Sequence, residues 1–381
     1  MSRVLIVLAA VFLSACTQVP VRGTGNLGIV IERADGRVTV VDTTAKSVLG
    51  RIEGLGDLSH ASAVFARDGR YAYVFGRDGG LTKVDILLQR IEKRVMQAGN
   101  SIGGAISQDG RLVVAQNYTP GGIKVFDAET LEQLSEVSTQ SKVVGLVDLS
   151  GQRFAYALFD KGEIWITDLS DPRQPKTEKF PAGQQPYDGL VTPDGRHYMA
   201  GLFGEDGIAL LDTWKPEEGA RKILENYGRG QEKLPVFKMP HLRGWAVAGN
   251  QAYLPAIGRH EVLVVDKGTW QETRRIKVKG QPVFVMARPD GRQVWVNFAF
   301  PDNGWVQVID TLKGEVVQTL QPGKAILHME FTPRGEAVWL SARDDHMVSI
   351  YDTQTFARLA TLPAQSPSGI FFTSRAARTG F

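Results

Sequence analysis

Cysteine is almost absent from this sequence, with one in 381 residues. That count excludes a disulfide within the chain, a cysteine-ligated zinc or iron–sulfur centre, and attachment of a c-type haem through C-x-x-C-H. An excess of one charge is also missing, because Lys and Arg total 44 against 41 Asp and Glu. Such balance argues against a chain that binds nucleic acid through its phosphates. The composition, 43% hydrophobic with 41 glycines, instead favours a full core of short strands joined by tight turns.

Long apolar runs are confined to the N-terminus. Arg3 precedes an apolar run over residues 4–13, followed by Ala15 and Cys16. This pattern predicts a secretory signal, too short to span a bilayer. Because the sole cysteine follows a small residue, the segment resembles a bacterial lipobox, which implies cleavage after residue 15, lipid on Cys16 and a tether over residues 16–27. Thr17 after the cysteine then favours a periplasmic protein anchored to the outer membrane. The alternative is an ordinary signal peptide that contains a cysteine.

The remainder of the chain is built from repeats. Strand-like segments end in an aspartate eight times, at intervals of 43, 42, 41, 44, 54, 44 and 42 residues, at Asp42, Asp85, Asp127, Asp168, Asp212, Asp266, Asp310 and Asp352. A turn, most often Asp-Gly, lies about 18 residues before most of these aspartates, and apolar residues alternate around it. Each unit therefore predicts four short antiparallel strands, which is one propeller blade.

Eight units predict an all-β fold, an eight-bladed β-propeller of four-stranded antiparallel blades. The first unit lacks an inner strand before Gly28, while residues 368–373 form a surplus strand at the other end. We therefore expect the C-terminus to supply the inner strand of the first blade and close the ring. Residues 28–381 then form a single domain without open sheet edges.

Two histidines fall at equivalent places in the repeat. Counting eight residues back from each turn selects positions that should line the mouth of the central channel, namely His60, Ser101, Lys142, Pro186, His241, Pro282, Ile326 and Pro367. His60 and His241 belong to the second and sixth blades, so they should face each other across the ring, unless their register is coincidental. Opposed imidazoles suit axial ligation of a flat metallated ring. His328 is either a third imidazole in the channel or a core histidine.

Basic residues recur in the second set of loops at the same end of the propeller. Arg77 and Arg343 share one register, Arg259 lies close to it, and Asn117 and Tyr118 occupy the matching loop of the third blade. As a set these residues favour a ligand with several carboxylates, because a guanidinium pairs with carboxylate in a forked geometry. The alternative is a group of solvated charges at hairpin tips.

Two further features have competing interpretations. The 54-residue interval marks an insertion near residues 215–240, which is either a mobile flap over the mouth or an ordinary long loop. Residues 23–28 spell G-x-G-x-x-G, but that motif binds dinucleotides when it follows a strand and opens a helix. Here it leads into a predicted strand, so a flexible linker is favoured over a dinucleotide site.

Several segments of the second unit resemble the second blade of the d1-haem domain of cytochrome cd1 nitrite reductase, namely His60, residues 68–71 (DGRY), residues 75–78 (FGRD) and residues 84–86 (VDI). The resemblance implies that d1-haem or an iron-containing precursor is the ligand. It implies that His60 is the proximal iron ligand and that Arg77 contacts the carboxylates of the ring. Tyr118 is similar to another pocket residue, and His241 to a distal histidine of that family.

The sequence departs from the reductase in two ways. No second distal histidine is found near residues 282–284, and there is no c-type haem domain to deliver electrons. Both departures argue against nitrite reduction. What remains resembles the tethered d1-type propeller of d1-haem biosynthesis, which implies binding and maturation of a late precursor. The partners that this resemblance implies are nitrite reductase and the dihydro-d1-haem dehydrogenase.

Three functions follow from these observations. The first is an enzyme, an oxidoreductase or side-chain-modifying enzyme of a d1-haem precursor, with acid–base candidates His60, His241, Tyr187, Glu205, Asp206 and Asp302. The second is a carrier that returns the tetrapyrrole unchanged. The third is a protein-interaction propeller with no affinity for porphyrinoids.

Overall fold

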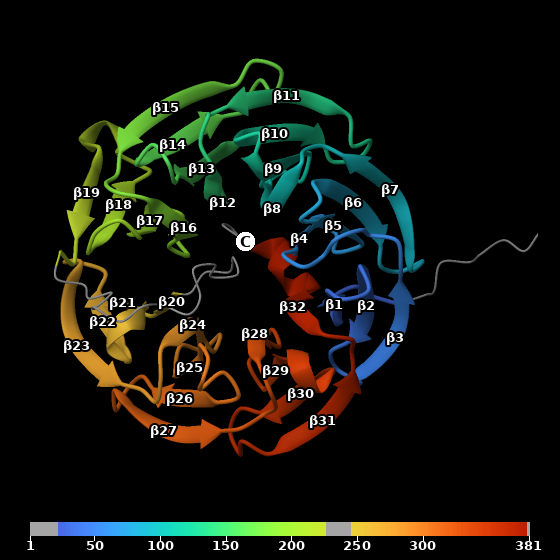
Figure 1. Cartoon of the computed structure of the whole chain (residues 1–381), viewed down its shortest axis with the longest axis vertical. Helices are drawn as coiled ribbons and strands as arrows, with labels where there is room; N and C mark the ends of the chain where they lie inside the picture. The colour runs from blue at the N-terminus through green and yellow to red at the C-terminus, as the bar shows by residue number, and fades with distance from the viewer. Residues whose placement is uncertain (1–21, 226–244, 379–381) are drawn as a thin grey trace, which may run out of the picture.

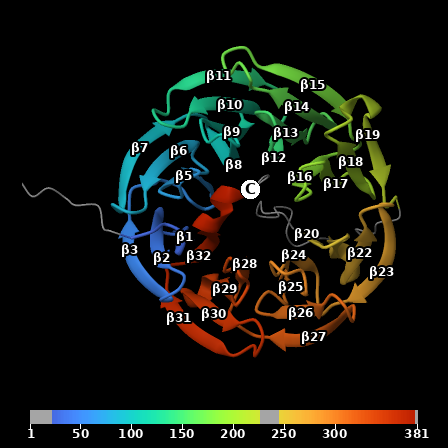
Figure 2. The same ribbon diagram turned by 180° about the vertical axis from the view of Figure 1, so that it is seen from behind.

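The predicted propeller is confirmed. A computed structural model describes residues 22–225 and 245–378, and its strands form eight four-stranded antiparallel sheets. Seen from either side, the inner strands encircle a common axis (Figure 1 and Figure 2). Helix in the described residues is limited to four short 3₁₀ segments: η1 (Pro216–Glu218), η2 (Ile257–Arg259), η3 (Arg343–Asp345) and η4 (Thr373–Ala377). None of these could cross a membrane.

The first four blades follow the chain once the C-terminal strand is in place. From the inner strand outward, blade 1 consists of β32 (Pro367–Phe372), β1 (Leu27–Glu32), β2 (Arg37–Asp42) and β3 (Ser47–Ile52). Blades 2 to 4 consist of β4 (Ser62–Phe65), β5 (Tyr71–Phe75), β6 (Gly80–Asp85) and β7 (Arg90–Met96); β8 (Asn100–Ile106), β9 (Leu112–Thr119), β10 (Gly122–Asp127) and β11 (Gln133–Ser138); and β12 (Val143–Leu149), β13 (Arg153–Leu158), β14 (Glu163–Asp168) and β15 (Lys176–Pro181).

The second half of the ring repeats this order. Blades 5 to 8 consist of β16 (Pro186–Val191), β17 (His197–Leu202), β18 (Ile208–Asp212) and β19 (Ala220–Ile223); β20 (Ala246–Ala248), β21 (Gln251–Ala256), β22 (Glu261–Asp266) and β23 (Gln271–Lys277); β24 (Pro282–Ala287), β25 (Gln293–Phe298), β26 (Val306–Asp310) and β27 (Glu315–Leu320); and β28 (Ile326–Phe331), β29 (Ala337–Ala342), β30 (Met347–Asp352) and β31 (Arg358–Pro363).

The recurring aspartates have a structural cause. Asp42 Oδ1 accepts hydrogen bonds from the backbone N–H groups of Thr44 and Ala45, at 2.9 and 2.8 Å. A side-chain oxygen that accepts such bonds closes a tight turn after the strand. The same pattern recurs at Asp85, Asp127, Asp310 and Asp352. The repeat in the sequence is therefore the repeat of the turn between the third and outer strands.

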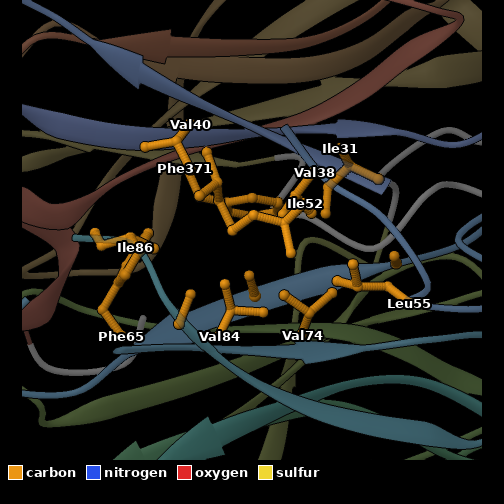
Figure 3. Packing of buried hydrophobic residues seen from close by; sticks show 14 of the residues in the cluster. Ile31, Val38, Val40, Ile52, Leu55, Phe65, Val74, Val84, Ile86 and Phe371 are labelled. Atoms are coloured by element: carbon orange, nitrogen blue, oxygen red, sulfur yellow. The ribbon is translucent and has the colours of Figure 1, made fainter. Parts of the chain in front are cut away.

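The core lies between neighbouring blades. Val38 and Val40 of blade 1 pack against Val74 and Val84 of blade 2, and Phe371 of the C-terminal strand joins the same cluster (Figure 3). These side chains are buried, and burial of apolar surface is the main favourable term in folding. Each blade is thus stable only with a neighbour on both sides, so the ring must close.

Closure occurs as the sequence predicts. Strand β32 pairs antiparallel with β1, with Gly28 opposite Phe372 and Val30 opposite Ile370. The carboxylate of Glu32, which is buried, accepts a hydrogen bond of 2.9 Å from the backbone N–H of Gln365. The two ends of the chain are therefore joined within one blade.

The chain then turns inward, which the sequence did not predict. Beyond β32 it continues toward the axis as η4 (Figure 1). There the guanidinium of Arg375 forms two hydrogen bonds with the carboxylate of Glu330, at 2.8 and 2.5 Å. Both side chains are buried, with 8% and 5% of their surface exposed. Arg67 also donates a 2.7 Å bond to the carbonyl of Ala376, so η4 is held from blades 2 and 8.

Replacing Arg375 should destabilise the propeller strongly. Breaking a buried ion pair from one side leaves a buried charge and costs about 3–5 kcal/mol. We expect Arg375→Ala to lower the free energy of unfolding in urea by about that amount. Arg334→Ala is the matched control, because Arg334 lies 3.4 Å from Glu336 in an exposed pair, worth less than about 1 kcal/mol. Equal losses in the two variants would contradict a role of the buried pair in closure.

Candidate functional site

One end of the ring, here called the upper face, carries the loops that join second to third strands. An equivalent position at the end of the second strand or the start of this loop lies nine residues before the terminal aspartate of each blade, or eight in blade 2. In blades 8, 1 and 2 these residues are Arg343, Arg33 and Arg77, and in blades 3, 4 and 5 they are Tyr118, Phe159 and Phe203. The mouth therefore has a cationic arc over three consecutive blades and an aromatic arc over the next three.

The three arginines influence one another. The pKa of Arg33 is lowered because partial burial disfavours its charge and because Arg343 and Arg77 repel it. Asp57 offsets part of this repulsion, and its own pKa is lowered although burial opposes the shift, since Ser59, Arg77 and Arg33 stabilise the carboxylate. By contrast, the ion pair with Asp344 raises the pKa of Arg343. The cationic arc is therefore a site of positive charge centred on Arg33 that Asp57 and Asp344 compensate only in part.

Arg33, like Phe159 and Phe203, is a site residue that the sequence analysis did not predict. Its register was counted from the turn after each inner strand, and in blade 1 that turn lies at the opposite end of the chain. Counting back from Asp42 instead places Arg33 in the same loop position as Arg343 before Asp352. The sequence therefore contains the register of Arg33, but it can be recognised only after the C-terminal strand has been assigned to blade 1.

His60 and Arg77 lie together. His60 lies two residues before the first residue of the inner strand β4, and its Nδ1 lies 3.1 Å from Nη1 of Arg77. The backbone of this loop is held in place, because Arg77 N–H donates to the carbonyl of Asp57 at 2.8 Å. The carboxylate of Asp78 is bound by Arg94 at 2.5 Å and by Gly80 N–H at 2.9 Å. The sequence placed His60 and Arg77 on separate loops, and the fold brings them into contact.

Tyr118 and Tyr187 form the centre of the aromatic arc. Their hydroxyl oxygens are 3.0 Å apart, and the ring of Tyr187 lies 5.8 Å from Phe159 and 4.8 Å from Phe203 between centroids. Burial raises the pKa of Tyr187 to about 12, and burial with the neighbouring Tyr187 raises that of Tyr118 further. Both hydroxyls are therefore protonated at neutral pH and can donate hydrogen bonds at the mouth.

Asn117 does not share this position with its neighbour Tyr118. It is buried, and its amide exchanges two hydrogen bonds of 2.9 Å with the amide of Gln97. With 1% of its surface exposed and its amide paired with Gln97, Asn117 has no side-chain group directed at the mouth. The expectation that Asn117 contacts a ligand is corrected to a packing role.

His328 has the surroundings of a core histidine, the second of the two alternatives. It is 3% exposed and packs against Phe284 and Phe371. Its Nδ1 accepts a 3.0 Å hydrogen bond from the N–H of Ile370, which ties β28 to the closing strand. Burial, together with Arg375, lowers its pKa well below the usual value, so the ring is neutral.

The acidic candidates are mostly engaged in ion pairs. Glu205 accepts a hydrogen bond from Gln184 N–H at 2.8 Å and pairs with Lys222 at 2.9 Å. Asp302 lies 3.6 Å from Lys279, and Asp206 is half-buried beside Glu205. Arg259, in η2, is exposed. Glu205 and Asp302 lie in the upper loops of blades 5 and 7, where these lysines neutralise their carboxylates.

Some expectations concern residues that the structure does not describe. Cys16 and the signal segment precede residue 22, and His241 with most of the inserted loop falls within residues 226–244. The G-x-G-x-x-G segment is described in its entirety, and it runs into β1 rather than into a helix N-terminus.

The upper face fits a metal that arrives inside a macrocycle. No three His, Cys, Asp or Glu side chains gather as a metal site within residues 22–225 and 245–378. The cavity below the mouth, lined by Gly104, Gly145, Tyr187, Asp188 and Arg375 among others, has a volume of about 60 Å³. Ligand pockets hold roughly 300 Å³ or more, so this cavity is too small to enclose a tetrapyrrole. A single imidazole, an arc of arginines and an arc of aromatics suit such a flat, carboxylated ligand.

Comparisons with known proteins agree with this description. The chain is 59% identical over 388 residues to Protein NirF of Pseudomonas aeruginosa, covering 99% of each chain, and 58% identical over 390 residues to Protein NirF of Stutzerimonas stutzeri, covering 100% of each. The solved structure of dihydro-heme d1 dehydrogenase NirN in complex with DHE has the same fold, with a TM-score of 0.81, 24% identity, and coverage of 95% of this chain and 78% of that one. Residues 22–376 match the family described as Cytochrome D1 heme domain, and the chain therefore belongs to that family.

Proposed function

We propose that the protein binds iron d1-haem or a late precursor of it across the mouth of the propeller, and that it acts in a late step of d1-haem biosynthesis. The observation that carries this proposal is the cationic arc of Arg343, Arg33 and Arg77 beside His60. The relatives named NirF and the NirN complex with DHE support the same class of ligand.

The cationic arc supports a ligand with more than one carboxylate. Burial, and then repulsion by Arg343 and Arg77, lower the pKa of Arg33, so the unliganded arc carries electrostatic strain. Bound carboxylates would relieve that strain and accept forked hydrogen bonds from the guanidinium groups. A ligand without carboxylates would leave the repulsion in place.

The aromatic arc supports a flat ring system. Tyr118, Phe159 and Phe203 follow one another in blades 3 to 5, next to the arginines of blades 8, 1 and 2. Aromatic faces bury a large apolar area and prefer stacked or edge-on contacts with other rings. The mouth therefore orients the carboxylated edge of the ligand toward blades 8, 1 and 2.

Two roles are consistent with this site. As an enzyme, the protein oxidises the precursor, with an external electron acceptor taking up the electrons, or modifies a side chain, and the Tyr118–Tyr187 pair is able to hold or donate a proton. The bound iron tetrapyrrole would supply the redox-active centre. As a carrier, it holds the ligand for transfer to nitrite reductase or to the dihydro-d1-haem dehydrogenase, which is favoured by the engagement of Glu205 and Asp302 in ion pairs.

The site of action that we propose is the periplasm, with a lipid on Cys16 holding the protein to the outer membrane. The support is the apolar run over residues 4–13 followed by Ala15 and the sole cysteine. Labelling with radioactive palmitate, compared with Cys16→Ser, tests this assignment.

The ligand is tested by titrating full-length protein, purified in detergent, with iron d1-haem. We expect a shift of the Soret band that His60→Ala removes, because His60 ligates the iron. Arg33→Ala and Arg343→Ala should each weaken binding by about 10- to 100-fold, the loss typical of one charged hydrogen-bonding group. Arg259→Ala, an exposed arginine, should change the dissociation constant by less than about twofold.

A spectrum that does not change with wild-type protein would reject the tetrapyrrole and favour the interaction propeller. Where binding occurs, the mass of the recovered ligand separates the two roles. An altered mass identifies an enzyme, whereas an unchanged mass under all redox conditions identifies a carrier.

The electrostatic strain of the arc makes a second prediction. Arg33→Met should raise the free energy of unfolding of the unliganded protein by on the order of 1 kcal/mol at about 0.01 M salt, because a partly buried and repelled charge is removed. The gain should shrink toward 1 M salt, where the Debye length falls from about 30 Å to about 3 Å. Arg259→Met is the control and should show no such gain. A loss of stability in Arg33→Met at low salt would contradict the strain.

A further inference from the structure

The contact between Arg77 and His60 determines which imidazole nitrogen carries the proton. A guanidinium has donors and no acceptor, and it stays protonated in proteins. Because Arg77 Nη1 lies 3.1 Å from His60 Nδ1, Nδ1 must be the acceptor of this hydrogen bond. A neutral His60 therefore carries its proton on Nε2.

This arrangement is unsuited to iron ligation. A nitrogen ligates a metal through its lone pair, and a metal-bound histidine usually donates its other N–H to an acceptor. In the structure Nδ1 faces Arg77, and the proton of a neutral imidazole is then assigned to Nε2. Neither nitrogen of neutral His60 is ready to bind iron while Arg77 stays in place.

We propose that Arg77 gates His60, so that a ligand carboxylate must draw Arg77 away from Nδ1 before His60 can ligate the iron. The inference rests on the proposed function, since it assumes a carboxylated iron tetrapyrrole at the mouth. It couples two recognition events, because the ligand must present a carboxylate to Arg77 and iron to His60 at the same time.

The exchange leaves the proton count unchanged. The proton leaves Nε2 as iron approaches, and Nδ1 takes up a proton when Arg77 departs, so the imidazole remains neutral throughout. The guanidinium keeps its charge and replaces the imidazole acceptor with a carboxylate. A charged acceptor gives the stronger hydrogen bond, so the exchange is favourable once a carboxylate is present.

The surrounding loop allows the side chain, but not the backbone, to move. Arg77 N–H is held by the carbonyl of Asp57, and Gly76 N–H by the carbonyl of Gly80, both at 2.8 Å. The charged groups around the guanidinium are Arg33 and Asp57, and its charge also reaches the two tyrosines. Repulsion from Arg33 favours departure toward an added negative charge.

Arg343 provides a matched control. It lies in the equivalent loop of blade 8, but its Nε donates to Asp344 at 2.6 Å. Both arginines can bind ligand carboxylates, yet the structure shows only Arg77 bonded to an imidazole, within the described chain. If Arg77 only binds carboxylates, Arg77→Ala and Arg343→Ala should behave alike. If Arg77 also controls His60, the two variants should differ.

The first measurement is the tautomer of His60 in unliganded protein, by ¹⁵N–¹H correlation spectra of histidine-labelled full-length chain. There are six histidines, and His60→Ala identifies the relevant signals. We expect the Nε2–H form in wild type and in Arg343→Ala, and a mixture that includes Nδ1–H in Arg77→Ala. An Nδ1–H form in wild type would overturn the proposal.

The second measurement compares iron d1-haem with its methyl ester, which lacks free carboxylates. In wild type we expect the histidine-ligated Soret spectrum with the free acid and not with the ester. Arg77→Ala should bind the free acid more weakly but should recover histidine ligation of the ester, with an affinity at least about tenfold above that of wild type for the ester. Arg343→Ala should weaken binding without this recovery.

The outcomes separate the gate from the proposed function. Histidine ligation of the ester by wild type, or no recovery in Arg77→Ala, overturns the gate while leaving the tetrapyrrole site intact. No binding of the free acid by any protein, including wild type, overturns the proposed function itself. Recovery that disappears in the double variant His60→Ala/Arg77→Ala confirms that His60 is the ligand released.

Discussion

Pairing of β32 with β1 is the constraint on which the rest of this structure depends. Each blade buries apolar side chains against both neighbours, so an open ring would expose the core surfaces of blades 1 and 8. The C-terminal strand removes that exposure by completing blade 1 from the inside. It also carries Arg375 to the axis, where the ion pair with Glu330 fixes η4 beneath the mouth.

Once the ring is closed, order along the sequence becomes position around the mouth. Consecutive repeats contribute consecutive loops, so Arg33 and Arg77 are neighbours in space because their blades are neighbours in sequence. Tyr118 and Phe159, in the next two blades, begin the aromatic arc where the cationic arc ends. Arg343 joins them only because closure brings blade 8 beside blade 1. A flat ligand with carboxylates on one edge matches this division of the mouth.

The charges at the mouth are arranged for a ligand rather than for the stability of the free protein. Arg33 is repelled by its neighbours, and Arg77 occupies the imidazole nitrogen of His60. Both arrangements become more favourable when carboxylates are added, since these attract Arg33 and give Arg77 another acceptor. In the complex that we propose, binding of the anionic edge and ligation by His60 would be linked through the side chain of Arg77.

The sequence by itself determined the repeat, the number of blades, the closing strand and the loop position of His60 and Arg77. It could do so because the turn that ends each third strand is local, and a side-chain oxygen such as that of Asp42 bonds only two and three residues ahead. Only the tertiary structure decided which residues meet across blades. The partner of His328 comes from β32, Asn117 turns toward Gln97, and Arg33 completes an arc that begins in the last blade. Such contacts join segments far apart in the chain, so no periodic pattern records them.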